Sequence, residues 1–260
     1  MSSPPLPAEM LDSIADFLHD TRDALKSCCL VSKTWVPRTR KHLFAHVAFE
    51  SPGKLQSWKA TFPDPSTSPA RYTNSLFIEF SRSDIPTDVE EGGWIPTFSG
   101  VVHFAMKNFN DKTTYETLVP FQGFSPAIKS FCLTSPTIPF PQFLDFIRSF
   151  PLLEDLSVKA WSVDVDRVFE KQSTPTQPTK SPAFTGTLEL SFIMGMGVLA
   201  SGILRLPGGI HFRRLDLTWT FDQDISLTAV LVERCGPTLE YLDIGFGVLG
   251  MLALHLHLHQ

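Results

Sequence analysis

The chain has 260 residues, a formal net charge of -5 and 43% hydrophobic residues, a composition typical of a folded and mildly acidic protein. A chain of this length can bury enough apolar surface to fold without disulfides or a structural metal. Its 22 Lys and Arg are outnumbered by 27 Asp and Glu and form no long basic run. Nothing therefore supplies the positive surface that nucleic-acid binding needs.

The four cysteines do not follow the spacing of a disulfide scaffold or a zinc site, since Cys28 and Cys29 are adjacent while Cys132 and Cys235 stand alone. The first twenty residues contain acids and prolines but no arginine or lysine, unlike a secretory signal peptide. The apolar stretch at 190–204 contains glycines and is too short to span a membrane. We expect a reducing compartment, cytoplasmic or nuclear, and no membrane partner.

Three short amphipathic helices are predicted before residue 50. In the first, Leu11, Ile14 and Leu18 recur at steps of three and four and form one apolar face. The helices are expected at residues 7–18, 24–35 and 37–46. Because three short helices bury little apolar surface on their own, their apolar faces indicate that something else covers them.

A fourth helix is predicted from Ser51 to Phe62, with Ser51 as its N-cap and Pro52 in its first turn. The proline-rich run at 63–69 follows and cannot be helical. We divide the chain into residues 1–49, a helix and Pro-rich linker at 50–70, and a repeat region at 71–260.

Beyond residue 70 a short apolar alternation recurs at similar spacing. Its members are Leu76-x-Ile78, Val102-x-Phe104, Phe131-x-Leu133, Leu156-x-Val158, Leu188-x-Leu190, Leu215-x-Leu217 and Leu242-x-Ile244. Helical patterns precede several of these predicted strands, and the Thr/Pro-rich stretch 172–182 is expected to be an exposed loop. Since one helix–strand unit cannot cover both of its faces, neighbouring units must stack. The predicted fold is α/β, with N-terminal helices followed by a curved solenoid whose strands line the concave side.

The N-terminal segment resembles an F-box. The residues that carry this resemblance are Leu6-Pro7-Ala8-Glu9-Met10-Leu11, Ile14, Leu18, Leu25, Val31-Ser32-Lys33 and Trp35. The repeat region is similar to the degenerate leucine-rich repeats that follow the F-box in many fungal proteins, although it lacks the Asn that usually follows each strand. The N-terminal resemblance covers residues 6–35, and its opening and closing motifs both match in sequence and spacing.

This resemblance implies a substrate-recognition subunit of a Skp–cullin–F-box ubiquitin ligase. The F-box would bind the Skp adaptor, and through it a cullin scaffold, while the repeats would recruit an unidentified target protein. Such a receptor needs no cofactor and is not an enzyme, since it acts by raising the local concentration of target lysines. The alternative is a repeat-based protein-interaction scaffold that works outside a ubiquitin ligase.

Two sets of candidate site residues follow. The resemblance assigns adaptor binding to Leu6, Pro7, Glu9, Met10, Ile14, Leu18, Leu25, Val31 and Trp35. The alternation of side chains along each strand assigns target binding, on the concave face, to Glu79, His103, Thr134, Ser157, Lys159, Glu189, Asp216 and Asp243. The alternative for the first set is that these residues pack on the repeats. The alternative for the second set is that it lies on an ordinary solvated face of the sheet.

Three competing motifs predict other kinds of site. The run from Gly245 to Gly250 matches G-x-G-x-x-G, but too few residues follow it for a dinucleotide-binding unit. His255, His257 and His259 alternate as metal ligands could, although a frayed tail explains them more simply. His42 and His46 are spaced one helical turn apart without a catalytic Glu, so we predict a surface pair. We expect no metal and no nucleotide.

Overall fold

The computed structural model describes residues 7–79, 93–107, 118–135, 138–161, 182, 184–191, 193, 196–206, 209–219, 225–248 and 251–259. Over these residues the chain forms an α/β fold, with helices at the N-terminal end followed by one nine-stranded sheet. The prediction of an α/β fold with N-terminal helices is confirmed.

The helical part of the protein, residues 7–44, contains three α-helices. They are α1 (Ala8–Phe17), α2 (Arg22–Val31) and α3 (Val36–Leu43). Glu9 in the first turn of α1 and Pro37 in the first turn of α3 are favourable helix starts, since a carboxylate complements the helix dipole and proline needs no hydrogen-bond donor there. Because α3 ends at Leu43, the helix predicted up to His46 is too long.

The repeat part, residues 46–259, contributes all nine strands, and these lie in the sheet in chain order. They are β1 (His46–Phe49), β2 (Ser75–Glu79), β3 (His103–Lys107), β4 (Ser130–Thr134), β5 (Asp155–Lys159), β6 (Thr187–Ser191), β7 (Arg214–Trp219), β8 (Tyr241–Val248) and β9 (Met251–His259). β1 to β8 run parallel, and only β9 pairs antiparallel with its neighbour. Each connection therefore advances the chain by one strand, as expected for a solenoid of leucine-rich-repeat type.

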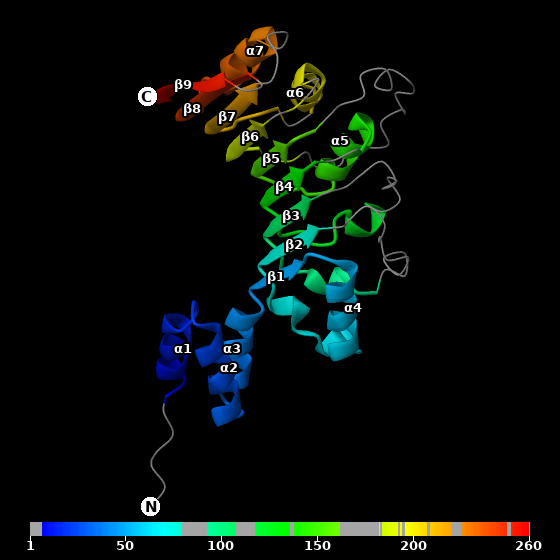
Figure 1. The fold of residues 1–260 in the computed structure, drawn as a ribbon, viewed down its shortest axis with the longest axis vertical. Coiled ribbons are helices and arrows are strands. Elements are labelled where there is room, and N and C mark those ends of the chain that lie inside the picture. Colours follow the sequence, from blue (N-terminus) through cyan, green and yellow to red (C-terminus); the bar gives the residue numbers. More distant parts are fainter. Residues whose placement is uncertain are drawn as a thin grey trace, which may run out of the picture.

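The connections place helices on one side of the sheet (Figure 1). Over the described residues, α-helices occur in four of them, namely α4 (Pro52–Thr61), α5 (Phe140–Arg148), α6 (Met196–Leu204) and α7 (Ile225–Cys235). Others contain short 3-10 helices, including η2 (Pro69–Tyr72), η4 (Ile95–Phe98) and η6 (Val119–Phe121). The helical part lies beyond the β1 edge of the sheet, and the side of the sheet opposite α4 to α7 is open (Figure 1).

The first strand, β1, is absent from the sequence-based prediction. It falls inside the segment that we assign to the N-terminal unit, and the predicted fourth helix, confirmed as α4, links β1 to β2. Residues 50–70 are therefore the first β–α–β connection of the sheet. β1 contains only Val47 and Phe49 as buried residues, so its alternation is too short to be distinctive.

The alternation predicts the inward-facing residues of the other parallel strands almost everywhere. Two residues in each strand point into the core, as shown by Leu76 and Ile78 in β2, which are 1% and 2% exposed. The register pairs them with Phe104 and Met106 in β3, so the predicted pair Val102-x-Phe104 is shifted by one alternation. The shift leaves His103 on the same face as predicted.

Aromatic side chains fill the space between the sheet and its connections. Phe131 is 1% exposed, and its ring centroid lies 5.5 Å from Phe104, 5.4 Å from Phe146 and 6.2 Å from Phe150. Such ring pairs add to the stabilisation that burial of their area already gives. The many phenylalanines of the chain thus form a continuous core that runs from one strand to the next.

The C-terminal end of the sheet differs from the expected frayed tail. Met251–His259 forms β9, which pairs antiparallel with β8 and covers its edge. The predicted exposed loop at 172–182 lies outside the described residues except for Pro182, which is buried.

Candidate functional site

The helical part has a small core of its own. Among its described apolar side chains only Leu11, Ala15 and Leu25 are buried. The buried Thr39 joins them because its Oγ1 donates a hydrogen bond to the carbonyl oxygen of Trp35 at 2.8 Å. So few buried side chains provide little of the hydrophobic stabilisation that holds a domain together.

An ion pair and a carboxylate–histidine contact connect α1 to α3. Asp12 contacts Arg38, and Asp16 Oδ1 lies 2.8 Å from Nε2 of His42. Both pairs are partly exposed, so each contributes only about 0–1 kcal/mol. Their main effect is on orientation, because they hold the Asp12 and Asp16 side of α1 against α3.

The opposite side of α1 carries exposed apolar residues. Met10, Ile14 and Phe17 follow one another at steps of four and three and so lie on one face, roughly opposite Asp12 and Asp16. Phe17 is 85% exposed. The end of α2 adds Leu30 and Val31, which are 89% and 74% exposed. We call these five residues, Met10, Ile14, Phe17, Leu30 and Val31, the exposed apolar set.

The predicted adaptor-binding residues differ in their exposure. Pro7, Glu9, Met10, Ile14 and Val31 are exposed, Leu18 and Trp35 are partly buried, Leu25 is buried, and Leu6 lies outside the described residues. Leu25 is only 1% exposed, so its assignment to a partner surface is corrected: it packs inside the helical part. The predicted site lacks Phe17 and Leu30, which are the most exposed apolar residues of the helical part.

The open side of the sheet is a polar face built from the outward residues of successive strands. Inward and outward residues alternate along β2, β4 and β5, where each buried residue has a partly exposed neighbour. The parallel register brings Ser157, Glu189, Asp216 and Asp243 to the same level on adjacent strands. The polar face therefore presents a row of carboxylates across β6, β7 and β8.

A hydrogen-bonded ion pair lies at one end of this row. Ser157 Oγ donates to Glu189 Oε2 at 2.7 Å, and Lys159 Nζ lies 2.5 Å from Glu189 Oε1. Burial alone would lower the pKa of Lys159, but the hydrogen bond and the negative charge of Glu189 outweigh it and raise that pKa. Glu189 is therefore engaged by an ion pair and a hydrogen bond from its neighbours on β5.

The negative charge of Asp216 is less well compensated by neighbouring cations than that of Glu189. Burial raises the pKa of its carboxyl group, and the negative charges of Glu189 and Asp243 raise it further, while Arg214 and Lys159 act in the opposite direction. Arg214 also stacks on Tyr241, with its guanidinium carbon 4.0 Å from the ring centroid. The row of carboxylates thus carries negative charge that suits a cationic group of a binding partner.

All eight predicted target-binding residues lie on the polar face of the sheet. They are Glu79, His103, Thr134, Ser157, Lys159, Glu189, Asp216 and Asp243; His103 is exposed and the others are partly buried. Glu79 forms an ion pair with Lys107 at 3.1 Å, so it is engaged within the sheet. The prediction omits Cys132, whose Sγ lies 3.6 Å from Ser157 Oγ, although the same alternation places it on this face.

Two of the three competing motifs do not form their expected sites. Gly245 and Gly247 lie within β8, which is followed by a strand and not by the helix that a dinucleotide site requires. His42 belongs to α3 whereas His46 belongs to β1, so the two are not ligands on one helix. The side chains of His255, His257 and His259 lie outside the described part of the chain.

Other classes of site are not indicated either. Within the described residues no three His, Cys, Asp or Glu side chains gather as metal ligands would. Of the helices described, none has the length and apolar character needed to cross a membrane. Protein-family models give no match to this chain, and none of the curated proteins matches it significantly.

Proposed function

We propose that the protein is the substrate receptor of a Skp–cullin–F-box ubiquitin ligase. The helical part, as an F-box, binds the Skp adaptor, and the polar face of a leucine-rich-repeat solenoid recruits the target protein. The receptor supplies no reacting group and acts by holding target lysines near the ligation machinery.

The exposed apolar set carries this proposal. Large apolar side chains that stay exposed on a folded protein mark interaction surfaces, and an apolar helix face is a common way to bind a partner. Burying one such side chain contributes about 1.5–3 kcal/mol. Phe17, Leu30 and Val31 are therefore the side chains whose burial by an adaptor would contribute most to binding.

A firm junction between the two parts also supports a receptor function. Phe44 at the end of α3 packs edge-on against Trp58 and Phe62 of the first connection, with centroid distances of 5.7 and 5.9 Å. A receptor has to hold its target at a set distance from the adaptor. Packing of this kind restricts motion between the helical part and the sheet.

The proposal is tested by co-expressing the full chain with a Skp adaptor and analysing the complex by size-exclusion chromatography. Replacing Leu30 and Val31 by Ser removes two apolar side chains that are exposed, so we expect the stability of the fold to change little. We expect wild type to form a one-to-one complex, and the double variant to bind at least about 100-fold more weakly because about 3 kcal/mol of burial is lost.

A matched control is available on the repeat part. Val119 and Leu152 are 47% and 51% exposed, so Val119→Ser with Leu152→Ser removes the same two residue types at a distance from the helical part. This control should bind the adaptor like wild type. A folded wild-type chain that never elutes with the adaptor would contradict the ligase proposal and favour a scaffold that acts outside a ligase.

A further inference from the structure

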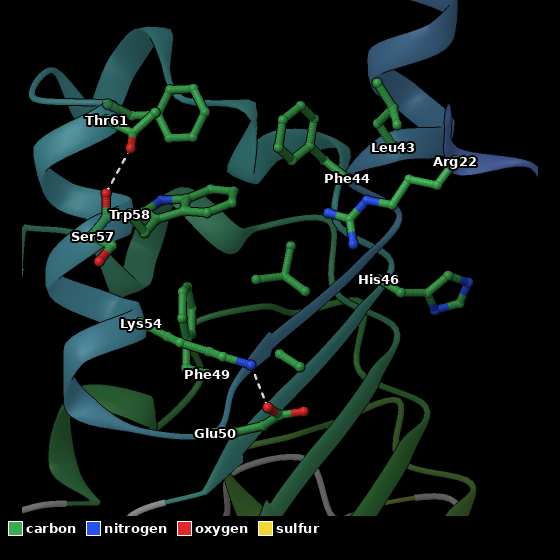
Figure 2. Close-up of a pocket in the computed structure, with 13 residues that line it drawn as sticks. Arg22, Leu43, Phe44, His46, Phe49, Glu50, Lys54, Ser57, Trp58 and Thr61 are labelled. Carbon is green, nitrogen blue, oxygen red and sulfur yellow. Dashed lines mark hydrogen bonds and ion pairs between the residues drawn. The ribbon is translucent and has the colours of Figure 1, made fainter. Parts of the chain in front are cut away.

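A cavity of about 610 Å³ lies where the helical part meets the repeat part. Its walls come from the start of α2, the end of α3, β1 and the inner side of α4. Figure 2 shows the labelled residues of the cavity surrounding a space between α4 and the end of the helical part. Volumes of this size are typical of small-molecule sites, which often lie between two structural units.

Aromatic rings form much of the wall. Trp58 of α4 lies at the centre of this group, with ring centroids 5.7 Å from Phe44, 4.8 Å from Phe62 and 5.7 Å from Phe49. Phe49 is 4% exposed and therefore fixed in the core. Because these rings hold one another in place, the cavity offers a preformed surface for a flat apolar group.

The polar groups of the cavity favour an anion. The side chain of Arg22 extends from the start of α2 toward Phe44 and Trp58 (Figure 2). Among the described residues its guanidinium group makes no hydrogen bond or ion pair, since the neighbouring Asp23 is bonded to Lys26. On the other side of the cavity Lys54 is neutralised by Glu50. Arg22 attracts the neighbouring Asp23 electrostatically, but its exposed guanidinium N–H groups stay available to a bound anion.

We propose that this cavity binds a small molecule of the aromatic carboxylate class. The planar guanidinium of Arg22 matches a carboxylate with two parallel hydrogen bonds. The apolar body of the ligand packs against Trp58 and Phe44. The site does not depend on the ligase proposal, because none of its lining residues belongs to the exposed apolar set or to the predicted target-binding residues.

The site joins the two parts of the protein. Arg22 and Phe44 belong to the helical part, whereas Trp58 and Phe49 belong to the repeat part. A ligand that contacts both sides stabilises the junction, because binding to the folded state alone raises the free energy of unfolding. Occupancy of the cavity is therefore linked to how firmly the helical part is held.

Isothermal titration of the purified full chain with 2-naphthoate tests the proposal, with neutral 2-naphthamide as the matched ligand. We expect 2-naphthoate to bind at least about 10-fold more tightly than the amide, because hydrogen bonds between two ionised groups are stronger than those to a neutral amide. Arg22→Gln should remove this preference. Arg40→Gln makes the same charge change on the exposed side of α3 and should leave it intact.

Three outcomes would overturn the proposal. They are the absence of binding by 2-naphthoate, equal affinity for acid and amide, and an unchanged preference in Arg22→Gln. A thermal melt that matches wild type shows that each variant is folded, which is expected because Arg22 is exposed. Adaptor binding is measured separately, so failure of this site does not affect the ligase proposal and failure of the ligase proposal does not affect this site.

Discussion

The repeat part and the helical part bury their apolar side chains to very different extents. In the repeat part, each of the parallel strands β2 to β7 supplies two inward apolar residues to one core that is continuous along the sheet. The helical part buries three apolar side chains and exposes five large ones. Among the described residues, the sheet thus has an extensive apolar core of its own, whereas the helices leave most of their large apolar side chains exposed.

The exposed surfaces of the two parts differ in the same way. The polar face of the sheet satisfies many of its charges internally, for example Glu79 with Lys107 and Glu189 with Lys159. Contact of the exposed apolar set with water is unfavourable, and these side chains become stabilising only when a partner buries them. We therefore expect a permanent partner at the helices and a more selective, charge-dependent partner at the sheet.

The largest effect should come from breaking the continuous core. Phe131→Ala removes a ring that touches Phe104, Phe146 and Phe150, and should lower the free energy of unfolding by about 3–5 kcal/mol, measured by chemical denaturation. Phe17→Ala, at an 85% exposed site, is the control and should change stability by no more than about 0.5 kcal/mol. Similar losses in both variants would contradict the contrast between the two parts.

A smaller and more local effect is expected from Leu25→Ala. Leu25 is the largest fully buried side chain of the helical part, and its truncation should cost about 2–3 kcal/mol there. Because the helical core is small, hydrogen exchange of the α1 to α3 amides should become fast while β4 to β7 stay protected. Equal loss of protection in both parts would show that they unfold as one unit.

The sequence predicts the sheet better than it predicts the site. Period-two alternation locates β2 and β4 to β8 because each has a pair of inward apolar residues, both buried in every strand except β8, where Ile244 is partly buried. In β3 the apolar positions 102, 104 and 106 all fit the pattern, so only pairing with β2 selects Phe104 and Met106. β1 is missed because its two buried residues become distinctive only through pairing with a strand that lies far along the chain.

The helical surface could be predicted only in part. Leu25 and Leu30 are the same residue type on the same helix, and the packing of α3 decides that one is buried and the other exposed. The junction cavity was not predictable, since its walls combine Arg22 with residues of β1 and α4. A pattern along the chain indicates which face is apolar, but not which distant element covers it.

The smallest expected effect concerns the charge of the polar face. Because burial and the charges of Glu189 and Asp243 raise the pKa of Asp216 above its unfolded value, the native state holds this proton more tightly than the unfolded chain. Between those two pKa values stability falls as the pH rises, so at neutral pH the charged carboxylate is destabilising. Asp216→Asn should therefore raise the melting temperature at neutral pH by about 1–2 °C, a small shift because solvent screens the partly exposed group.

The gain should disappear in acid, below the ordinary pKa of aspartate, where both states are protonated. Glu233→Gln, at an exposed position of α7, is the control and should not show this pH dependence. A lower melting temperature for Asp216→Asn at neutral pH would mean that attraction to Arg214 and Lys159 outweighs burial and repulsion. In that case the carboxylates would be paired within the sheet, and the polar face would have little free negative charge to offer a cationic target.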